Sequence, residues 1–253
     1  MMGAESQQTK APIEEAVDEL RAAAEAATVA PLVARRRARR LQYLLIFSLS
    51  IFILLAIAVS VDGDRYFDWD VALSRAIQSI PGIEPLMRII SIPGNNSLIA
   101  FGLVTITFFF LFMLRYRLEA YALVLSAGGG EFFNIAFKWL IGRPRPNMQL
   151  VNILVHETSR SFPSGHVMHY VNFYGMLFFF AYTLLRRSAL RSLLIVTWGG
   201  LVLLVGLSRI YLGAHWPSDV AAAYLGGGVW SIFVIDRYRH WIKQNNNVKE
   251  IDH

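Results

Sequence analysis

The sequence predicts an all-α polytopic membrane protein, with six transmembrane helices in a bundle and additional surface amphipathic helices. Hydrophobic residues make up 55% of the 253 residues and the mean hydropathy is positive, so the chain is too apolar for an ordinary soluble domain. A bilayer core takes about 20 apolar residues per helical span. Six stretches qualify, of which the third and fifth are weaker because they carry polar residues: 42–61, 97–114, 119–140, 167–185, 192–211 and 217–235.

The first span follows a basic tail. The net charge is +6, and most of the excess lies directly before residue 42, in Arg35, Arg36, Arg37, Arg39 and Arg40. We interpret this cluster as a cytosolic membrane anchor and expect no nucleic-acid partner. Residues 1–34 are rich in Ala and Glu and are expected to be mobile with some helix. About 41 residues precede the apolar run, which favours a retained anchor, with signal-peptide cleavage near Ala56 and Ala58 as the alternative.

The segment 62–96 is predicted to form two short amphipathic helices. Apolar residues recur at helical spacing, Pro81 and Pro93 break the pattern, and Pro85 suits the first turn of the second helix. The helices either lie on the membrane surface or simply pack over the bundle.

Basic residues in the loops set the expected orientation. If the Arg cluster is cytosolic, then the turns 115–118 and 186–191 and the tail from 237 are cytosolic as well, and all of them are basic. Both termini are therefore predicted to be cytoplasmic. The loops 141–166 and 208–216 then face the outer side, so their basic residues need another explanation.

The third span carries a polar stripe. Gly128, Gly129 and Gly130 allow close helix approach, and Glu131, Asn134 and Lys138 follow at spacings of three and four. Ionisable groups at membrane depth are candidates for function. Lys138 alone is also explained as a snorkelling residue at a span end, and the role of Glu131 stays open.

Two clusters of candidate site residues lie between the end of the third span and the start of the fourth. Lys138 is followed by Gly-Arg-Pro-Arg-Pro, where the prolines hold Arg143 and Arg145 on extended backbone and the arginine forks suit phosphate oxygens. Ser161 to His166 reads Ser-Phe-Pro-Ser-Gly-His, with Pro163 expected in the first helical turn. The N–H groups of this helix N-terminus would donate hydrogen bonds to a phosphate. We leave His169 as a residue that lines the same mouth.

A third cluster lies between the last two spans, where residues 208–219 read SRIYLGAHWPSD. Pro217 is expected to begin the sixth span, which puts Asp219 in its first turn. From there Asp219 would orient the ring of His215, and Arg209 adds a cation. The predicted topology puts all three clusters on one side of the membrane, which indicates phosphoryl transfer through a covalent histidine.

These clusters resemble a known family signature. Residues 138–146 match Lys-x6-Arg-Pro, residues 163–166 match Pro-Ser-Gly-His, and residues 208–219 match Ser-Arg-x5-His-x3-Asp. This pattern is similar to the tripartite signature of the type 2 phosphatidic acid phosphatase and vanadium haloperoxidase superfamily, in its bacterial membrane lipid phosphatase branch. The resemblance covers roughly 97–235 and implies a six-span helical lipid phosphatase. We place this domain over 42–240, between a cytosolic basic N-terminal tail over 1–41 and a cytosolic C-terminal tail over 241–253.

The resemblance also implies roles for individual residues. His215 would be the nucleophile that forms a phosphohistidine, Asp219 would hold it, and His166 would protonate the leaving oxygen. The phosphoryl oxygens would be bound by Lys138, Arg145, Arg209, Ser164 and Gly165. No carboxylate cluster suited to Mg²⁺ lies near the motifs, so neither a metal nor another cofactor is expected.

The expected partner is a lipid phosphate in the bilayer, hydrolysed at the outer face of the plasma (inner) membrane. Undecaprenyl diphosphate is our first choice, and phosphatidylglycerophosphate, phosphatidate and lipid A phosphate remain open. Hydropathy argues against a soluble vanadium haloperoxidase. A lipid transporter or catalytically silent lipid-binding protein is the alternative from another class. The sequence does not predict the oligomeric state.

Overall fold

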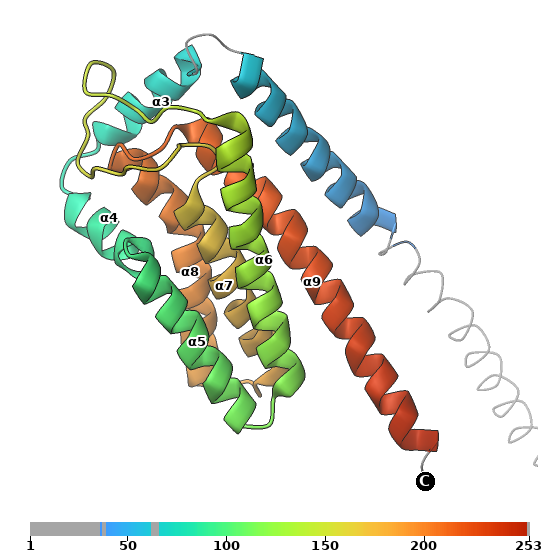
Figure 1. Ribbon diagram of the computed structural model, residues 1–253. Helices are drawn as coiled ribbons and strands as arrows, with labels where there is room; N and C mark the ends of the chain where they lie inside the picture. The colour runs from blue at the N-terminus through green and yellow to red at the C-terminus, as the bar shows by residue number, and fades with distance from the viewer. Residues whose placement is uncertain (1–35, 37–38, 62–65, 252–253) are drawn as a thin grey trace, which may run out of the picture. The chain divides into compact units, whose positions relative to one another are not determined.

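The computed structural model describes residue 36, residues 39–61 and residues 66–251, without the side chains beyond residue 244. The tail expected over 1–34 lies outside these residues. The chain divides into two units, Met1–Phe47 and Ser48–His253, and only the second is discussed in terms of packing. The described residues contain helices and no strand (Figure 1), as an all-α fold requires.

Helices occupy all six stretches expected to span the membrane. The first is Arg39–Val61, which continues into the second unit. The others are α5 (Ser97–Met113), α6 (Arg117–Ile141), α7 (Gly165–Leu184), α8 (Ala189–Tyr211) and α9 (Pro217–Ile251). Local signals explain several ends: the Asn96 side chain caps α5, the left-handed Gly142 ends α6, and Pro217 begins α9.

Length and apolarity do not rank the spans as the sequence pattern did. Four helices are long and apolar enough to cross a membrane: Arg39–Val61, Arg117–Ile141, Ala189–Tyr211 and Pro217–Gln244. Among these four the third expected span is the least apolar, as expected, whereas the fifth is more apolar than the sixth, so treating the fifth as weaker was wrong. A fifth span is possible if Glu84–Gly94 and Ser97–Met113, which meet at a bend of 63°, are counted as one.

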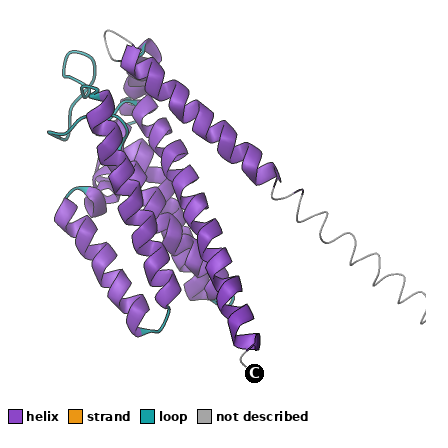
Figure 2. Cartoon of the chain, turned by 45° about the vertical axis from the view of Figure 1, so that its right-hand side comes forward, coloured by secondary structure: helices purple, strands orange, loops and turns teal. Residues whose placement is uncertain are grey.

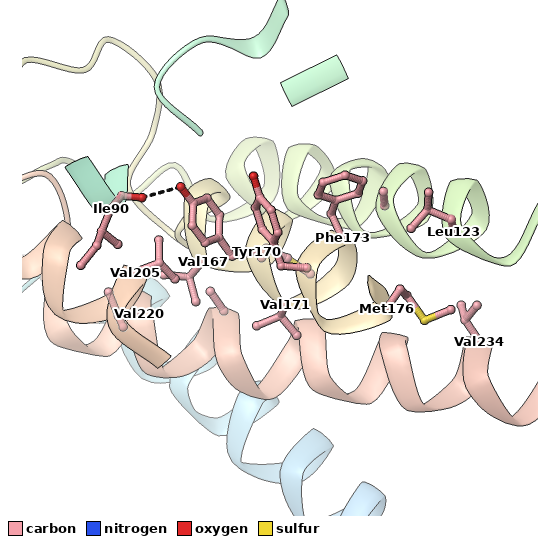
Figure 3. Close-up of a cluster of buried hydrophobic side chains, with 14 of the residues drawn as sticks. Ile90, Leu123, Val167, Tyr170, Val171, Phe173, Met176, Val205, Val220 and Val234 are labelled. Atoms are coloured by element: carbon pink, nitrogen blue, oxygen red, sulfur yellow. Dashed lines mark hydrogen bonds between the residues drawn. The ribbon is translucent and has the colours of Figure 1, made fainter. Parts of the chain in front are cut away.

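The helix α7 is the centre of the core and packs against α6, α8 and α9. Its buried residues Val167, Tyr170, Val171, Phe173 and Met176 meet side chains from these neighbours (Figure 3). The Tyr170 hydroxyl donates to the Ile90 carbonyl at 2.6 Å. A helix enclosed by other helices faces little lipid, so it tolerates the polar residues that weaken its apolar pattern.

Two of the expected small-residue contacts are present. A Cβ on Gly130 would lie 2.1 Å from the Asn172 side chain of α7, and one on Gly129 would lie 2.2 Å from the Trp230 side chain of α9. Gly128 faces open space. The glycine run therefore brings α6 close to two neighbouring helices through two of its three residues.

The segment before α5 forms the two short helices that the sequence predicts, α3 (Asp68–Gln78) and α4 (Glu84–Ser91), with Pro85 in the first turn of α4. Met87 and Ile90 of α4 are buried in the core, whereas Leu86 and Ile89 are exposed. The short 3-10 helix η1 (Ile92–Gly94) then leads towards α5. The helix α4 thus packs over the bundle and also presents an apolar outer face.

Loops from distant parts of the chain meet at one end of the bundle (Figures 1 and 2). The loop 142–164 joins the turn between α8 and α9 through the Leu154 N–H, which donates to the Leu212 carbonyl at 3.0 Å. Gly213 in that turn has φ +70°, and a Cβ there would lie 2.1 Å from the Asn152 carbonyl oxygen. This close contact fixes the turn that carries His215.

Candidate active site

The structure brings the three sequence clusters to this end of the bundle. Lys138 is in the last turn of α6, Arg145 lies in the loop that follows, and His166 is in the first turn of α7. Arg209 is in the last turn of α8, His215 follows in the turn, and Asp219 is in the first turn of α9. Helix ends thus hold most of these side chains in fixed positions.

The ring of His215 is 1% exposed and has defined neighbours on both nitrogens. Nε2 lies 3.2 Å from Arg145 Nη1. Nδ1 lies 3.5 Å from both Ser161 Oγ and Asp219 Oδ2. Because a guanidinium only donates, this geometry favours the tautomer with its proton on Nδ1 and a lone pair on Nε2.

Electrostatics keep His215 neutral. Burial lowers the pKa of His215 well below its ordinary value, and the charges of Arg145, Lys138 and Arg209 lower it further. The neutral ring retains the lone pair that a nucleophile needs.

The carboxylate of Asp219 is bound mainly by groups other than His215. Oδ1 accepts from Arg143 Nη1 at 2.5 Å. Oδ2 accepts from Ser161 Oγ at 2.5 Å and from the Trp216 N–H at 2.9 Å. The contact with His215 is longer than these three. The other groups therefore hold Asp219 in place, and Asp219 and Ser161 together orient the His215 ring.

Arg143, a candidate phosphate ligand in the sequence pattern, is surrounded by protein groups. Its side chain is fully buried and pairs with Asp219 and, at 2.8 Å, with Asp70 Oδ2. It also donates to Ser218 Oγ at 2.7 Å. Asp70 in turn accepts from the Ser218 N–H at 2.8 Å and from Ser218 Oγ at 2.7 Å. The guanidinium therefore serves a buried network behind the carboxylate.

The other cations have polar partners that leave donors available. Arg145 donates to the Ser159 carbonyl and to the Ala214 carbonyl, each at 2.7 Å. Lys138 donates to the Arg160 carbonyl. Arg209 donates to Ser91 Oγ at 2.5 Å, while its buried Nε has no hydrogen-bond partner among the described residues.

The start of α7 differs from the prediction by two residues. The helix begins at Gly165 with Ser164 as its N-cap, so Pro163 precedes the helix and does not lie in its first turn. The Ser164 N–H donates to the Asp219 carbonyl at 3.3 Å, and its buried Oγ lacks a partner within the described part of the chain. A buried hydroxyl normally makes a hydrogen bond, so Ser164 Oγ is a candidate donor to a bound phosphate.

His166 is held from outside the motifs. Its Nε2 lies 3.1 Å from Asn95 Oδ1, which also accepts from Ser91 Oγ at 2.8 Å. Asn95 Oδ1 also lies 3.5 Å from Arg209 Nη1. Glu157 in turn links Arg209 to Arg145, the neighbour of His215. The two imidazoles therefore border one site.

The two residues with open roles lie differently. The ring of His169 stacks on Phe173 at 5.5 Å, and its buried Nε2 has no partner among the residues that the structure describes. Glu131 lies on the outside of α6, near Asn134 and Lys138 of the polar stripe. These contacts give neither residue a catalytic role.

Four residues of the site were missed or left without a role: Asp70, Asn95, Glu157 and Ser161. Glu157 bridges the two arginines, with Oε1 at 2.5 Å from Arg209 Nη2 and Oε2 at 3.8 Å from Arg145 Nη2. Ser161 lies in the stretch 161–166, next to the Pro-Ser-Gly-His motif, so its position could have indicated a role in the site. Asp70, Asn95 and Glu157 belong to no motif and gave no signal by spacing.

Known proteins share sequence similarity with much of the chain. Residues 119–243 match the PAP2 superfamily. Phosphatidylglycerophosphatase B of Bacillus subtilis (strain 168) is 29% identical over 200 residues, which cover 76% of this chain and 93% of that protein.

Two solved structures share the fold. The crystal structure of a transmembrane PAP2 type phosphatidylglycerolphosphate phosphatase from Bacillus subtilis aligns with a TM-score of 0.67 at 28% identity, covering 78% of this chain and 97% of that one. Aquifex aeolicus LpxE aligns with a TM-score of 0.51 at 26% identity, covering 67% and 96%.

The fold and the site are those of an integral-membrane phosphatase, an enzyme that hydrolyses phosphoric monoesters. Apolar helices carry a cluster of cations, two histidines and a buried aspartate at one end of the bundle. The chain belongs to the PAP2 superfamily, in the branch that includes bacterial membrane lipid phosphatases.

Proposed function

We propose that the protein removes a phosphate group from a membrane lipid by way of a phosphohistidine. The observation that carries the proposal is the neutral, buried His215, whose Nε2 faces Arg145 while Nδ1 faces Asp219. A phosphoryl group beside Arg145 would therefore stand next to the nitrogen that attacks it.

The proposed reaction has two steps. His215 Nε2 attacks phosphorus, the phosphorus–oxygen bond to the lipid breaks, and His166 gives a proton to the leaving oxygen. Water then attacks the phosphohistidine, His166 takes a proton from that water, and inorganic phosphate leaves. The negative charge spread over the phosphoryl oxygens would be met by Lys138, Arg145 and Arg209, together with Ser164 Oγ and the Gly165 N–H.

The unused donors support these binding roles. Ser164 Oγ and Arg209 Nε are buried without a partner among the described residues, which is costly unless a ligand completes them. The chemistry assigned to cations and N–H groups needs no metal, and we propose a metal-independent enzyme.

We propose six spans, with the central α7 and the bent α4–α5 pair added to the four apolar helices. In this topology both termini are cytoplasmic and the active site lies on the outer face of the plasma membrane. The basic turns at 115–118 and 186–191 support that orientation. Labelling single cysteines, introduced at 116 and at 159, from either side of sealed vesicles tests it.

The names of the similar proteins favour phosphatidylglycerophosphate as the substrate over undecaprenyl diphosphate, our first choice from the sequence. Undecaprenyl diphosphate is kept as the second candidate because the loop carries a fourth cation, the exposed Arg160, whose backbone carbonyl accepts from Lys138 and whose guanidinium lies 3.4 Å from the Gly142 carbonyl. A second phosphate would find its counter-charge there.

A substrate panel on the purified protein tests the proposal. We expect phosphate release from phosphatidylglycerophosphate, undecaprenyl diphosphate, phosphatidate or lipid A, unaffected by EDTA and inhibited by orthovanadate. The transporter alternative predicts no release from any of them. An acid-labile, alkali-stable phosphoprotein formed with wild-type protein and absent from His215→Ala would identify the intermediate.

A further inference from the structure

Glu157 stands among the cations assigned to phosphate binding. Each oxygen of its carboxylate faces one arginine, at 2.5 Å from Arg209 Nη2 and at 3.8 Å from Arg145 Nη2. Its charge also acts on Lys138. A single carboxylate thus neutralises part of the positive charge that the proposed function gives to a phosphoryl group.

The burial of the pair shows how the carboxylate is placed. The Arg209 side chain is 0% exposed, whereas that of Glu157 is 24% exposed. Thr158, Ser159 and Arg160, which follow Glu157 in the loop, are all exposed. Glu157 therefore comes from a loop at the solvent side and reaches inward to a fully buried guanidinium.

The carboxylate fills only part of the anion site. Arg209 Nε and Ser164 Oγ remain without partners among the described residues, although both are buried. A phosphoryl dianion offers more charge and more acceptor oxygens than a carboxylate, and arginine binds it in the same forked geometry. A phosphoryl group that entered this site would therefore compete with Glu157 for Arg209 and Arg145.

The contacts of Arg145 argue against a permanent support. Its guanidinium is already fixed by the Ser159 carbonyl, Ser159 Oγ and the Ala214 carbonyl, at 2.7–2.9 Å. The 3.8 Å separation from Glu157 adds charge neutralisation without a hydrogen bond. Losing Glu157 would leave Arg145 in place.

We propose that Glu157 is a displaceable internal anion that occupies the arginine pair in the unliganded enzyme and is expelled by the substrate phosphoryl group. The inference rests on the proposed function and adds to it a residue that sets affinity. Glu157 weakens the binding of substrate and of product phosphate alike, and so limits inhibition by the phosphate that each turnover releases.

The experiment compares Glu157→Gln with the wild type in the full-length protein in detergent. Gln keeps the shape of the side chain and removes the charge. We expect inorganic phosphate and orthovanadate to bind about tenfold more tightly by titration calorimetry, equivalent to about 1.4 kcal/mol. The KM for the lipid substrate should fall with them. Glu157→Asp, which keeps the charge, should stay closer to the wild type.

Asp236→Asn is the matched control, because it removes one exposed carboxylate that pairs with Arg237 on α9, away from the site residues in sequence and structure. It should leave anion affinity unchanged. If Glu157 were a structural support, Glu157→Gln would weaken anion binding. A lower melting temperature is expected in either case, because Gln removes the counter-charge of the buried Arg209.

Unchanged or weaker phosphate binding in Glu157→Gln, with a wild type that binds phosphate and hydrolyses lipid phosphates, would overturn this inference alone. A wild type that neither binds phosphate nor releases it from lipids would overturn the proposed function as well.

Discussion

Replacing Asp70 by Asn should destabilise the protein and slow it, although Asp70 belongs to no motif. Asp70 is 0% exposed and accepts from Arg143 Nη2, from the Ser218 N–H and from Ser218 Oγ at 2.7–2.8 Å. An Asn carbonyl retains one acceptor oxygen and introduces an NH₂ group beside these donors. Arg143 would then keep Asp219 as its remaining carboxylate among these contacts.

The expected size follows from the burial of the pair. Removing one partner of a buried ion pair costs about 3–5 kcal/mol, and the second carboxylate on Arg143 puts this case near the lower end, at about 3 kcal/mol. For a chain of this size that corresponds to a melting temperature roughly 6–12 °C lower. Because Ser218 adjoins Asp219, we also expect kcat to fall about tenfold as the carboxylate loses its fixed position.

Thermal unfolding in detergent and steady-state kinetics measure both effects. Asp68→Asn is the matched control, since Asp68 is exposed and lies only two residues away in α3. Ser218→Ala gives a milder test if Asp70→Asn does not fold, because it removes hydroxyl bonds alone and should cost about 1 kcal/mol. Equal melting temperatures for Asp70→Asn, Asp68→Asn and the wild type would refute the reasoning.

Three further predictions concern the histidines. His215→Ala and His166→Ala should fold, as judged by melting temperature, yet release phosphate about 10³-fold or more slowly. The first variant lacks the nucleophile and the second lacks the proton donor. Turnover close to that of the wild type in either variant would remove the role assigned to that histidine. Burial, followed by Arg145, holds the pKa of His215 well below its usual range, so the folded ring stays neutral while the unfolded chain takes up a proton below about pH 6.5. This histidine therefore lowers stability only at acidic pH. The melting temperature of His215→Gln should fall less on acidification than that of the wild type. Parallel curves of melting temperature against pH for the two proteins would contradict the pKa shift. Asn95 Oδ1 lies 3.1 Å from His166 Nε2, so Asn95→Ala should lower kcat about tenfold for a lipid substrate. The loss should be smaller for p-nitrophenyl phosphate, whose leaving group needs little protonation. An equal loss for both substrates would mean that Asn95 has only a structural role.

Much of the fold could be predicted because its signals are local. Apolar runs gave the positions of the helices, and Pro85, Gly142 and Pro217 mark element ends by backbone chemistry alone. Composition leaves α7 outside the four apolar helices, although α7 is the centre of the bundle and packs against α6, α8 and α9. Enclosure is a tertiary property that a window of sequence does not contain.

The candidate site was predictable where residue types stand at fixed spacing. Lys138 with Arg145, and His215 with Asp219, each fall within one part of the signature, so their spacing could be read from the sequence. Arg143 shows the limit, since nothing local distinguishes it from Arg145, two residues on. The two side chains point to different partners on α3 and α9 and in the loop, and only the folded chain shows which is buried against Asp70.

The residues that the sequence did not reveal follow a common physical rule. Arg143 and Arg209 are both fully buried, and a buried guanidinium requires a counter-charge or several acceptors. Asp70 fills that need for Arg143 from 73 residues away, and Glu157 fills it for Arg209 from 52 residues away. The difference lies in exposure: Asp70 has no access to solvent and has to remain, whereas Glu157 borders solvent and can be replaced by another anion. The same electrostatic requirement thus gives a permanent partner behind the nucleophile and an exchangeable one in front of it.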